Sequence, residues 1–176
     1  KSKGNVVSPF DVMEKFGADL LRWYFYVSSA PGEPKPFSWK DIETKQKGFF
    51  ATLQNSTRFY ELYVGETPVK LQKLSVLDKW IMSRLHRLVR EISISIDSYD
   101  VTTAGRIIEQ FVTDDLSNWW LRRSRRRKEA LPLLRLILIE VSKLLAPFTP
   151  FVAEDLYRRM GGEAESVHLT DWPKVQ

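Results

Sequence analysis

The chain has 176 residues, 43% of them hydrophobic and 12% aromatic, so it is long enough for one sizeable core and far from the composition of a disordered chain. It contains no cysteine, which excludes disulfides, thiolate nucleophiles and cysteine-ligated zinc. Its 27 lysines and arginines outnumber the 22 acidic residues, and the formal net charge of +5 favours an anionic partner.

No apolar stretch reaches the roughly 20 residues that a membrane-spanning helix needs. The longest candidate, residues 131–145, is interrupted by Arg135, Glu140 and Lys143. We therefore expect no membrane partner, and with the missing cysteines we expect a reducing, cytoplasmic setting. The two histidines are far apart in sequence, so no metal site is expected. The chain begins without an initiator methionine or a signal peptide, and we expect it to be an excised piece.

Two helices are predicted before a proline-rich stretch. Ser8 can cap a helix that has proline at its first position and should end near Gly17, and a second helix should follow over residues 18–27. Residues 31–36 contain three prolines and a glycine and break regular structure. We place the domain boundary there, with a first segment at 1–36 and a helical domain at 37–176.

Two longer helices follow the boundary. The first is capped by Ser38 and should stop before Gly65. The second starts at Ser75 and carries an apolar stripe at helical spacing as far as Ile96.

Three more helical patterns complete the chain. Thr102 or Thr103 can cap a helix that ends in the basic run from Arg122, and an almost wholly apolar helix covers 131–145. Thr149 and the proline after it restart a short helix that runs to 161–162, and residues 166–172 should form a short strand or an extended strap. Because almost no segment alternates polar and apolar residues, we predict an all-α bundle.

The basic run is the strongest candidate binding site. The guanidinium group of arginine pairs with phosphates and stacks on bases. An exposed tryptophan ring can stack on an unpaired base, so the combination suits single-stranded or loop RNA. The candidate tRNA contacts of this run are Arg122, Arg123, Arg125, Arg126 and Arg127, with Trp119 and Trp120 beside them. An alternative stays open, in which the arginines pair with Asp114, Asp115 or Glu109 and the tryptophans belong to the core.

The first five residues form a second, weaker candidate. Two lysines, a serine and a glycine can wrap a nucleotide phosphate, although the same residues also suit a solvated terminus. The sequence shows no Ser/His/Asp set, close carboxylate pair or glycine-rich nucleotide fingerprint. The residues alone therefore predict a basic helical binding module.

Four blocks of the sequence resemble class I aminoacyl-tRNA synthetases. The first 24 residues resemble the segment that begins inside their Lys-Met-Ser-Lys-Ser signature. Residues 118–127, Asn-Trp-Trp-Leu-Arg-Arg-Ser-Arg-Arg-Arg, are similar to the arginine-rich signature of the isoleucine enzymes. Residues 144–151 and 166–173 resemble later blocks of the same family, so the resemblance covers the chain from end to end.

The resemblance implies a helical bundle of the class I synthetase anticodon-binding type, with a small N-terminal stem-contact segment and isoleucine tRNA as its partner. The parent enzyme would join isoleucine to its tRNA with ATP and Mg. Lys1 and Ser2 match the end of the signature, and the matching lysine steadies ATP phosphates, so Lys1 is the implied ATP-binding residue. The nucleotide-binding and editing domains lie outside this sequence, so we expect a catalytically inactive monomer whose second partner is the catalytic domain of the same protein.

The sequence departs from the family pattern between Arg127 and Leu131, where the family usually has aromatic residues and a longer connection. Either this member is shorter here, or residues of the connection are missing from this sequence. Lys3 and the arginine run favour the isoleucine branch over the valine and leucine branches. Two alternatives stay open: the same region of a valyl or leucyl enzyme, and a mainly structural helical domain whose arginines serve internal pairs.

Overall fold

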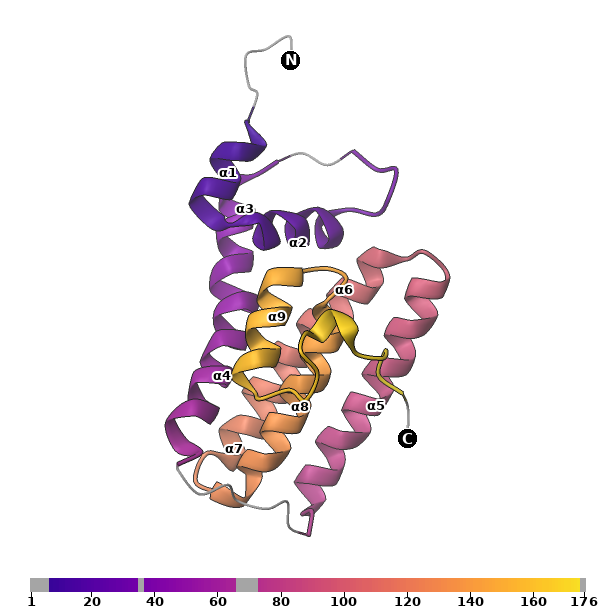
Figure 1. The fold of residues 1–176 in the computed structure, drawn as a ribbon. Coiled ribbons are helices and arrows are strands. Elements are labelled where there is room, and N and C mark those ends of the chain that lie inside the picture. Colours follow the sequence, from indigo (N-terminus) through magenta and orange to yellow (C-terminus); the bar gives the residue numbers. More distant parts are fainter. Residues whose placement is uncertain (1–6, 35–36, 66–72, 175–176) are drawn as a thin grey trace.

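The computed structural model describes residues 7–34, 37–65 and 73–174, and every regular element in these ranges is helical, which confirms the all-α prediction (Figure 1). In chain order the elements are α1 (Pro9–Phe16), α2 (Ala18–Ser28), α3 (Trp39–Lys45), η1 (Gln46–Phe50), α4 (Ala51–Tyr63), α5 (Val76–Asp97), α6 (Val101–Gln110), η2 (Phe111–Leu121), α7 (Arg122–Ser124), η3 (Lys128–Ala130), α8 (Leu131–Leu145), α9 (Pro150–Arg159) and η4 (Val167–Leu169).

Local capping starts three of these helices where the sequence predicts. The hydroxyl oxygens of Ser8 and Ser38 accept hydrogen bonds from backbone N–H groups in the first turns of α1 and α3. Ser75 and Asp78 form a reciprocal capping box at the start of α5. Gly17 separates α1 from α2 with a φ of 83°, a conformation that glycine adopts without strain.

The start of α6 differs from the prediction. Asp100, rather than Thr102 or Thr103, is the N-cap, and its carboxylate accepts a hydrogen bond from the Thr103 N–H at 3.0 Å. The Thr102 hydroxyl instead donates to the backbone carbonyls of Tyr26 and Ser29, which joins α6 to the end of α2. The cap residue was therefore misassigned because Asp100 offers the same chemistry two positions earlier.

Two continuous helical segments contain π-helical stretches. One runs through α3, η1 and α4 along one side of the bundle, and the other runs through α6, η2 and α7 (Figure 1). π-Helical turns are uncommon and often occur at functional sites. The C-terminal part returns through α8 and α9. The predicted tail, residues 166–172, contains no strand: Val167–Leu169 form the 3-10 turn η4, which was not predicted, and an extended strap follows it in the described residues.

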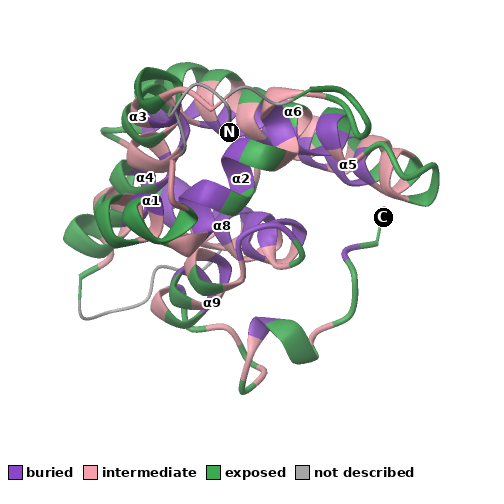
Figure 2. Ribbon diagram, turned by 90° about the horizontal axis from the view of Figure 1, so that it is seen from above, coloured by how far each residue is buried: buried purple, intermediate pink, exposed green. Residues whose placement is uncertain are grey.

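The core runs between the helices, with buried residues on their inward faces (Figure 2). Trp23 and Val27 of α2 belong to this main core, where Trp23 stacks on Phe49 with 4.6 Å between ring centroids. A smaller cluster joins α1, α2 and α3 through Val12, Leu20, Leu21, Tyr24 and Ile42. The first segment is thus packed on the bundle, and the proposed boundary at residue 36 remains a prediction.

Among the described residues, no helix combines the length and apolar character needed to cross a bilayer.

Candidate nucleic-acid interface

The basic run lies at the end of the helical segment formed by α6, η2 and α7, at the end of the bundle opposite α1 (Figure 1). One side of this segment is anchored in the core by Phe111, Val112, Leu116, Trp120 and Leu121. The opposite side exposes Arg122, Arg123, Arg125 and Arg126. Burial of the apolar side therefore places four guanidinium groups in solvent within little more than one helical turn.

Trp119 and Arg123 form a stacked pair on this exposed side. The guanidinium carbon of Arg123 lies 3.5 Å from the centroid of the Trp119 ring, and its Nη1 donates to the Trp119 carbonyl at 3.2 Å. Trp119 keeps 47% of its surface exposed, and its ring lies 6.2 Å from that of Trp80. The predicted neighbourhood of Trp119 and Arg123 is confirmed, and both side chains can be reached from solvent.

The exposed arginines have no acidic partner within the described ranges. Two carboxylates suggested as partners are engaged elsewhere: Asp115 accepts from Arg84 at 2.8 Å, and Glu109 accepts from Lys45 at 2.9 Å. Asp114 accepts a hydrogen bond from the hydroxyl of Thr113. The positive charge of this surface is therefore available to an anion from outside the chain.

Trp120 and Arg127 have a different role from the exposed arginines. Trp120 is 0% exposed, so its ring has no face free for a base. Its Nε1–H donates to Asp78 Oδ1 at 3.0 Å. Arg127 donates to the same carboxylate through two nitrogens, Nη1 to Oδ1 at 3.1 Å and Nη2 to Oδ2 at 2.6 Å. Of the seven candidate contacts, these two hold the helix end in place: Trp120 is buried, and Arg127 is partly buried against Asp78. Their role as tRNA contacts stays a prediction.

Asp78 is buried, with 3% of its surface exposed, and it collects hydrogen bonds from three parts of the chain. Besides Trp120 and Arg127, the N–H and hydroxyl of Ser75 donate to Oδ2 at 3.0 and 2.7 Å. Burial by itself raises the pKa of Asp78, but the hydrogen bonds from Arg127, Ser75 and Trp120 outweigh it and lower the pKa to about 2. The carboxylate therefore stays ionised throughout the neutral range.

The short connection after the run is a closed turn. The Arg127 N–H donates to the Ser124 carbonyl at 2.9 Å, and the Ala130 N–H donates to the Arg127 carbonyl at 3.1 Å. The single turn of η3 then leads directly into α8. The departure from the family pattern at this point is thus a compact reversal of the chain.

The family model for the anticodon-binding domain of tRNA ligase matches residues 78–176. The chain belongs to this family. The matched region begins at Asp78 itself and includes the whole arginine run, so the exposed arginines lie within the anticodon-binding domain.

The curated relatives extend the likeness to the full chain. The isoleucine–tRNA ligase of Deinococcus radiodurans is 41% identical over 192 residues, which cover 100% of this chain and 18% of that enzyme. The isoleucine–tRNA ligase of Clostridium tetani is 42% identical over 195 residues, covering 99% of this chain and 19% of the enzyme. The chain thus spans about a fifth of these relatives, and the aligned lengths exceed its 176 residues, so the relatives carry extra residues within the matched region.

Solved structures share the fold of this anticodon-binding domain. A LeuRS of Agrobacterium radiobacter K84, determined with tRNA and LeuAMS, superposes with a TM-score of 0.72 at 20% identity, over 99% of this chain and 22% of its own. The methionyl-tRNA synthetase of Mycobacterium tuberculosis superposes with a TM-score of 0.76 at 18% identity, over 89% of this chain and 34% of its own. At these identities the likeness concerns the fold.

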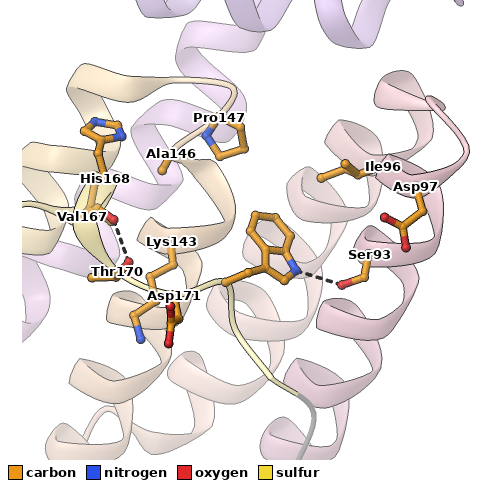
Figure 3. A pocket seen from close by; sticks show the side chains of 11 residues that line it. Ser93, Ile96, Asp97, Lys143, Ala146, Pro147, Val167, His168, Thr170 and Asp171 are labelled. Atoms are coloured by element: carbon orange, nitrogen blue, oxygen red, sulfur yellow. Dashed lines mark hydrogen bonds between the residues drawn. The ribbon is translucent and has the colours of Figure 1, made fainter.

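Two hollows lie away from the arginines. One, of about 610 Å³, lies between the C-terminal strap and helices α5 and α8, and Figure 3 shows Ser93, Ile96 and Asp97 on one side and Val167, His168 and Thr170 on the other. The indole Nε1–H of Trp172 donates to the Ser93 hydroxyl at 2.9 Å. The other, of about 650 Å³, lies beside Gly17 and the start of α9. The Trp172–Ser93 hydrogen bond, beside the first hollow, attaches the strap to α5.

The remaining candidates, Lys1 and Ser2, lie outside the described residues, so the ATP-binding role of Lys1 stays a prediction. Sequence reasoning missed Asp78 as part of the site. The Ser75-x-x-Asp78 pattern is a recognisable capping box, but nothing local connects it to partners 42 and 49 residues away.

Proposed function

We propose that this chain binds tRNA as the anticodon-binding region of an isoleucine–tRNA ligase, mainly through phosphate contacts of Arg122, Arg123, Arg125 and Arg126. The observation that carries the proposal is the set of four exposed guanidinium groups, without acidic partners in the described ranges, on a helix end fixed in the core. Trp119 adds an exposed aromatic surface on which an unpaired base can stack.

The isoleucine assignment is supported by the relatives, which are named isoleucine–tRNA ligases and match the chain over its full length at about 40% identity. In the whole enzyme, this region would act together with the catalytic domain, which would use ATP and Mg to join isoleucine to its tRNA. The monomeric state, the cytoplasmic setting and the catalytic inactivity of the chain alone remain predictions from the sequence.

A mainly structural role is favoured by one observation, the internal pair between Arg127 and Asp78. This pair accounts for one arginine of the run. The four exposed arginines form no ion pair with an acidic residue within the described ranges, and this difference favours RNA binding over a purely structural role.

The proposal is tested by titrating the chain with isoleucine tRNA and with an unrelated tRNA at low and moderate salt. A variant with alanine at Arg122, Arg123 and Arg126 removes three exposed charges of the run. A control with alanine at Lys40, Arg90 and Lys174 removes the same charge from exposed positions elsewhere. The proposal predicts weaker binding and a flatter salt dependence for the first variant only. If both variants weaken binding equally, the interaction depends only on the net charge of the chain and not on the arginine run. If the folded wild type does not bind tRNA, the proposal is contradicted.

A further inference from the structure

Asp78 is bonded to residues on both sides of the exposed arginines. Trp120 precedes Arg122 by two positions, and Arg127 directly follows Arg126. Both donate to the one carboxylate at distances between 2.6 and 3.1 Å. The four candidate phosphate contacts thus lie in a short segment, and residues at both ends of this segment form hydrogen bonds to the same buried carboxylate.

The carboxylate that binds both ends belongs to another helix. Asp78 lies in the first turn of α5, which begins at the same end of the bundle as the arginine run (Figure 1). Ser75 holds its carboxylate from the N-terminal side of that helix, at 2.7 and 3.0 Å. The position of the carboxylate is therefore set by the capping box of α5 and is independent of the arginines.

The arginine segment requires such an anchor for physical reasons. Its four neighbouring cations repel one another, and they lie in and just beyond α7, the last three residues of the continuous helical segment. Beyond Ser124 the chain turns sharply through Arg127 into η3. Because terminal helical turns fray readily, repulsion would open this turn unless a tertiary contact closed it.

The form of the contact also favours a positioning role. Arg127 and Asp78 meet through two parallel hydrogen bonds, a geometry that fixes orientation as well as distance. A well-packed apolar pair at such a site often gives comparable stability but does not define an orientation through two parallel hydrogen bonds. Here the geometry that the ion pair defines is that of the helix end carrying Arg122, Arg123, Arg125 and Arg126.

We propose that Asp78 is a positioning residue for RNA binding: through Trp120 and Arg127 it holds the exposed arginines in the arrangement that meets the tRNA phosphates. The inference rests on the proposed function and goes beyond it, because Asp78 is buried and is not itself one of the proposed phosphate contacts. Removing its charge should weaken tRNA binding although every exposed arginine is still present.

The test uses two variants that leave the exposed arginines intact. Asp78→Asn removes the negative charge of the carboxylate. Arg127→Lys keeps the net charge but loses the bidentate hydrogen bonding to Asp78. A stability control, Leu156→Ala, removes a buried side chain of α9. tRNA affinity is measured at several salt concentrations and at a temperature where all the variants are folded. Hydrogen exchange of the backbone amides of residues 122–127 is measured in parallel.

The expected result for Asp78→Asn is an affinity about tenfold lower and a salt slope smaller by about 1.5, the loss of roughly two phosphate contacts. Arg127→Lys should change both quantities in the same direction by less, and both variants should exchange faster at 122–127. Leu156→Ala should lower the melting temperature without altering the salt slope. This control separates positioning from stability.

Two outcomes would overturn the inference, and they differ from each other. If the alanine variant of Arg122, Arg123 and Arg126 loses binding while Asp78→Asn and Arg127→Lys bind like the wild type, Asp78 does not position the site and the proposed function stands. If the alanine variant itself binds like the wild type, the arginines are not the tRNA contact, and the positioning role fails together with the proposed function.

Discussion

The carboxylate of Asp19 in α2 accepts a hydrogen bond from the backbone N–H of Val152, at 2.7 Å, and so caps the start of α9 from a helix 133 residues earlier in the chain. The N-cap residue of α9, Thr149, makes no side-chain capping bond. Asp19 therefore joins the first segment of the chain to the last helix, with only 5% of its surface exposed.

Replacing Asp19 by alanine should lower the free energy of unfolding by about 1–2 kcal/mol, because it removes a helix cap and leaves the Val152 N–H without this acceptor. Asp19→Asn keeps an oxygen acceptor and should be milder. Urea unfolding at neutral pH measures both. Equal stability of the alanine variant and the wild type would show that this contact does not hold α9.

The pH dependence of Asp19 gives a separate prediction. Burial raises the pKa of Asp19 and outweighs the hydrogen bonds from Val152 and Phe151 that lower it. Because the folded pKa is raised, this group favours folding most at pH values below its unfolded pKa of about 3.8, and that contribution is lost as the pH rises through the folded value. Relative to Asp19→Asn, the wild type should thus lose stability from pH 3 towards neutrality. Urea unfolding of the wild type and Asp19→Asn at several pH values measures this. A difference in unfolding free energy that stays constant across these pH values would contradict the prediction.

Asp78 should show the opposite behaviour. Its folded pKa of about 2 lies below the ordinary 3.8, so its ionised form adds about 2 kcal/mol of stability above pH 3.8, and this is lost as the pH falls towards 2. Asp78→Asn should therefore unfold at a lower urea concentration than the wild type at pH 7. The difference between the two urea midpoints should become smaller as the pH is lowered. A difference that is unchanged at pH 2.5 would contradict this account.

The two neighbouring tryptophans should respond differently to substitution. Trp120→Phe keeps an aromatic ring in the core but loses the donor to Asp78, and should cost about 1–2 kcal/mol of unfolding free energy. Trp119→Ala removes a half-exposed ring, and should change stability by less while weakening tRNA binding. Unfolding and tRNA titration of both variants provide the comparison. A larger loss of stability for Trp119→Ala would reverse the roles inferred for these residues.

Gly105 marks the close approach of α6 to α2. A Cβ at this position would lie 2.7 Å from Cγ1 of Val27, a buried and stiff side chain. Gly105→Ala should therefore destabilise the fold by about 1–3 kcal/mol, despite the better helix propensity of alanine. Gly48→Ala in η1 is the matched control, because a Cβ added there would have no neighbouring atom within 4 Å. Equal effects of the two substitutions would argue against the packing explanation.

The sequence predicted most helix positions because their signals are local. Ser8, Ser38 and Ser75 are followed by the residues that a first turn needs, and each caps a helix in the structure. Thr102 and Thr103 misled the prediction because Asp100 caps equally well, and because the partners of Thr102 lie in α2 and directly after it. The π-helical stretches were not predicted, since no local signal in the sequence distinguishes them from the α-helix around them.

The candidate site was predicted as a group but not in its division of roles. Composition alone could not distinguish Arg126 from Arg127, or Trp119 from Trp120, although one member of each pair faces solvent and the other binds Asp78. The division depends on a carboxylate that lies far from the run in sequence. Such long-range pairing becomes visible only when the helices are packed.

The most direct test of the central claim is to locate the tRNA contact by ultraviolet cross-linking of the chain to isoleucine tRNA, followed by cleavage at glutamate and mass spectrometry. Cleavage after Glu109 and Glu129 releases residues 110–129, which contain Trp119 and all four exposed arginines in one peptide. We predict that this peptide carries the dominant cross-link, and that moderate salt and the alanine variant of Arg122, Arg123 and Arg126 both suppress it. A dominant cross-link in any other peptide, unchanged by that variant, would contradict the claim that the arginine run binds tRNA.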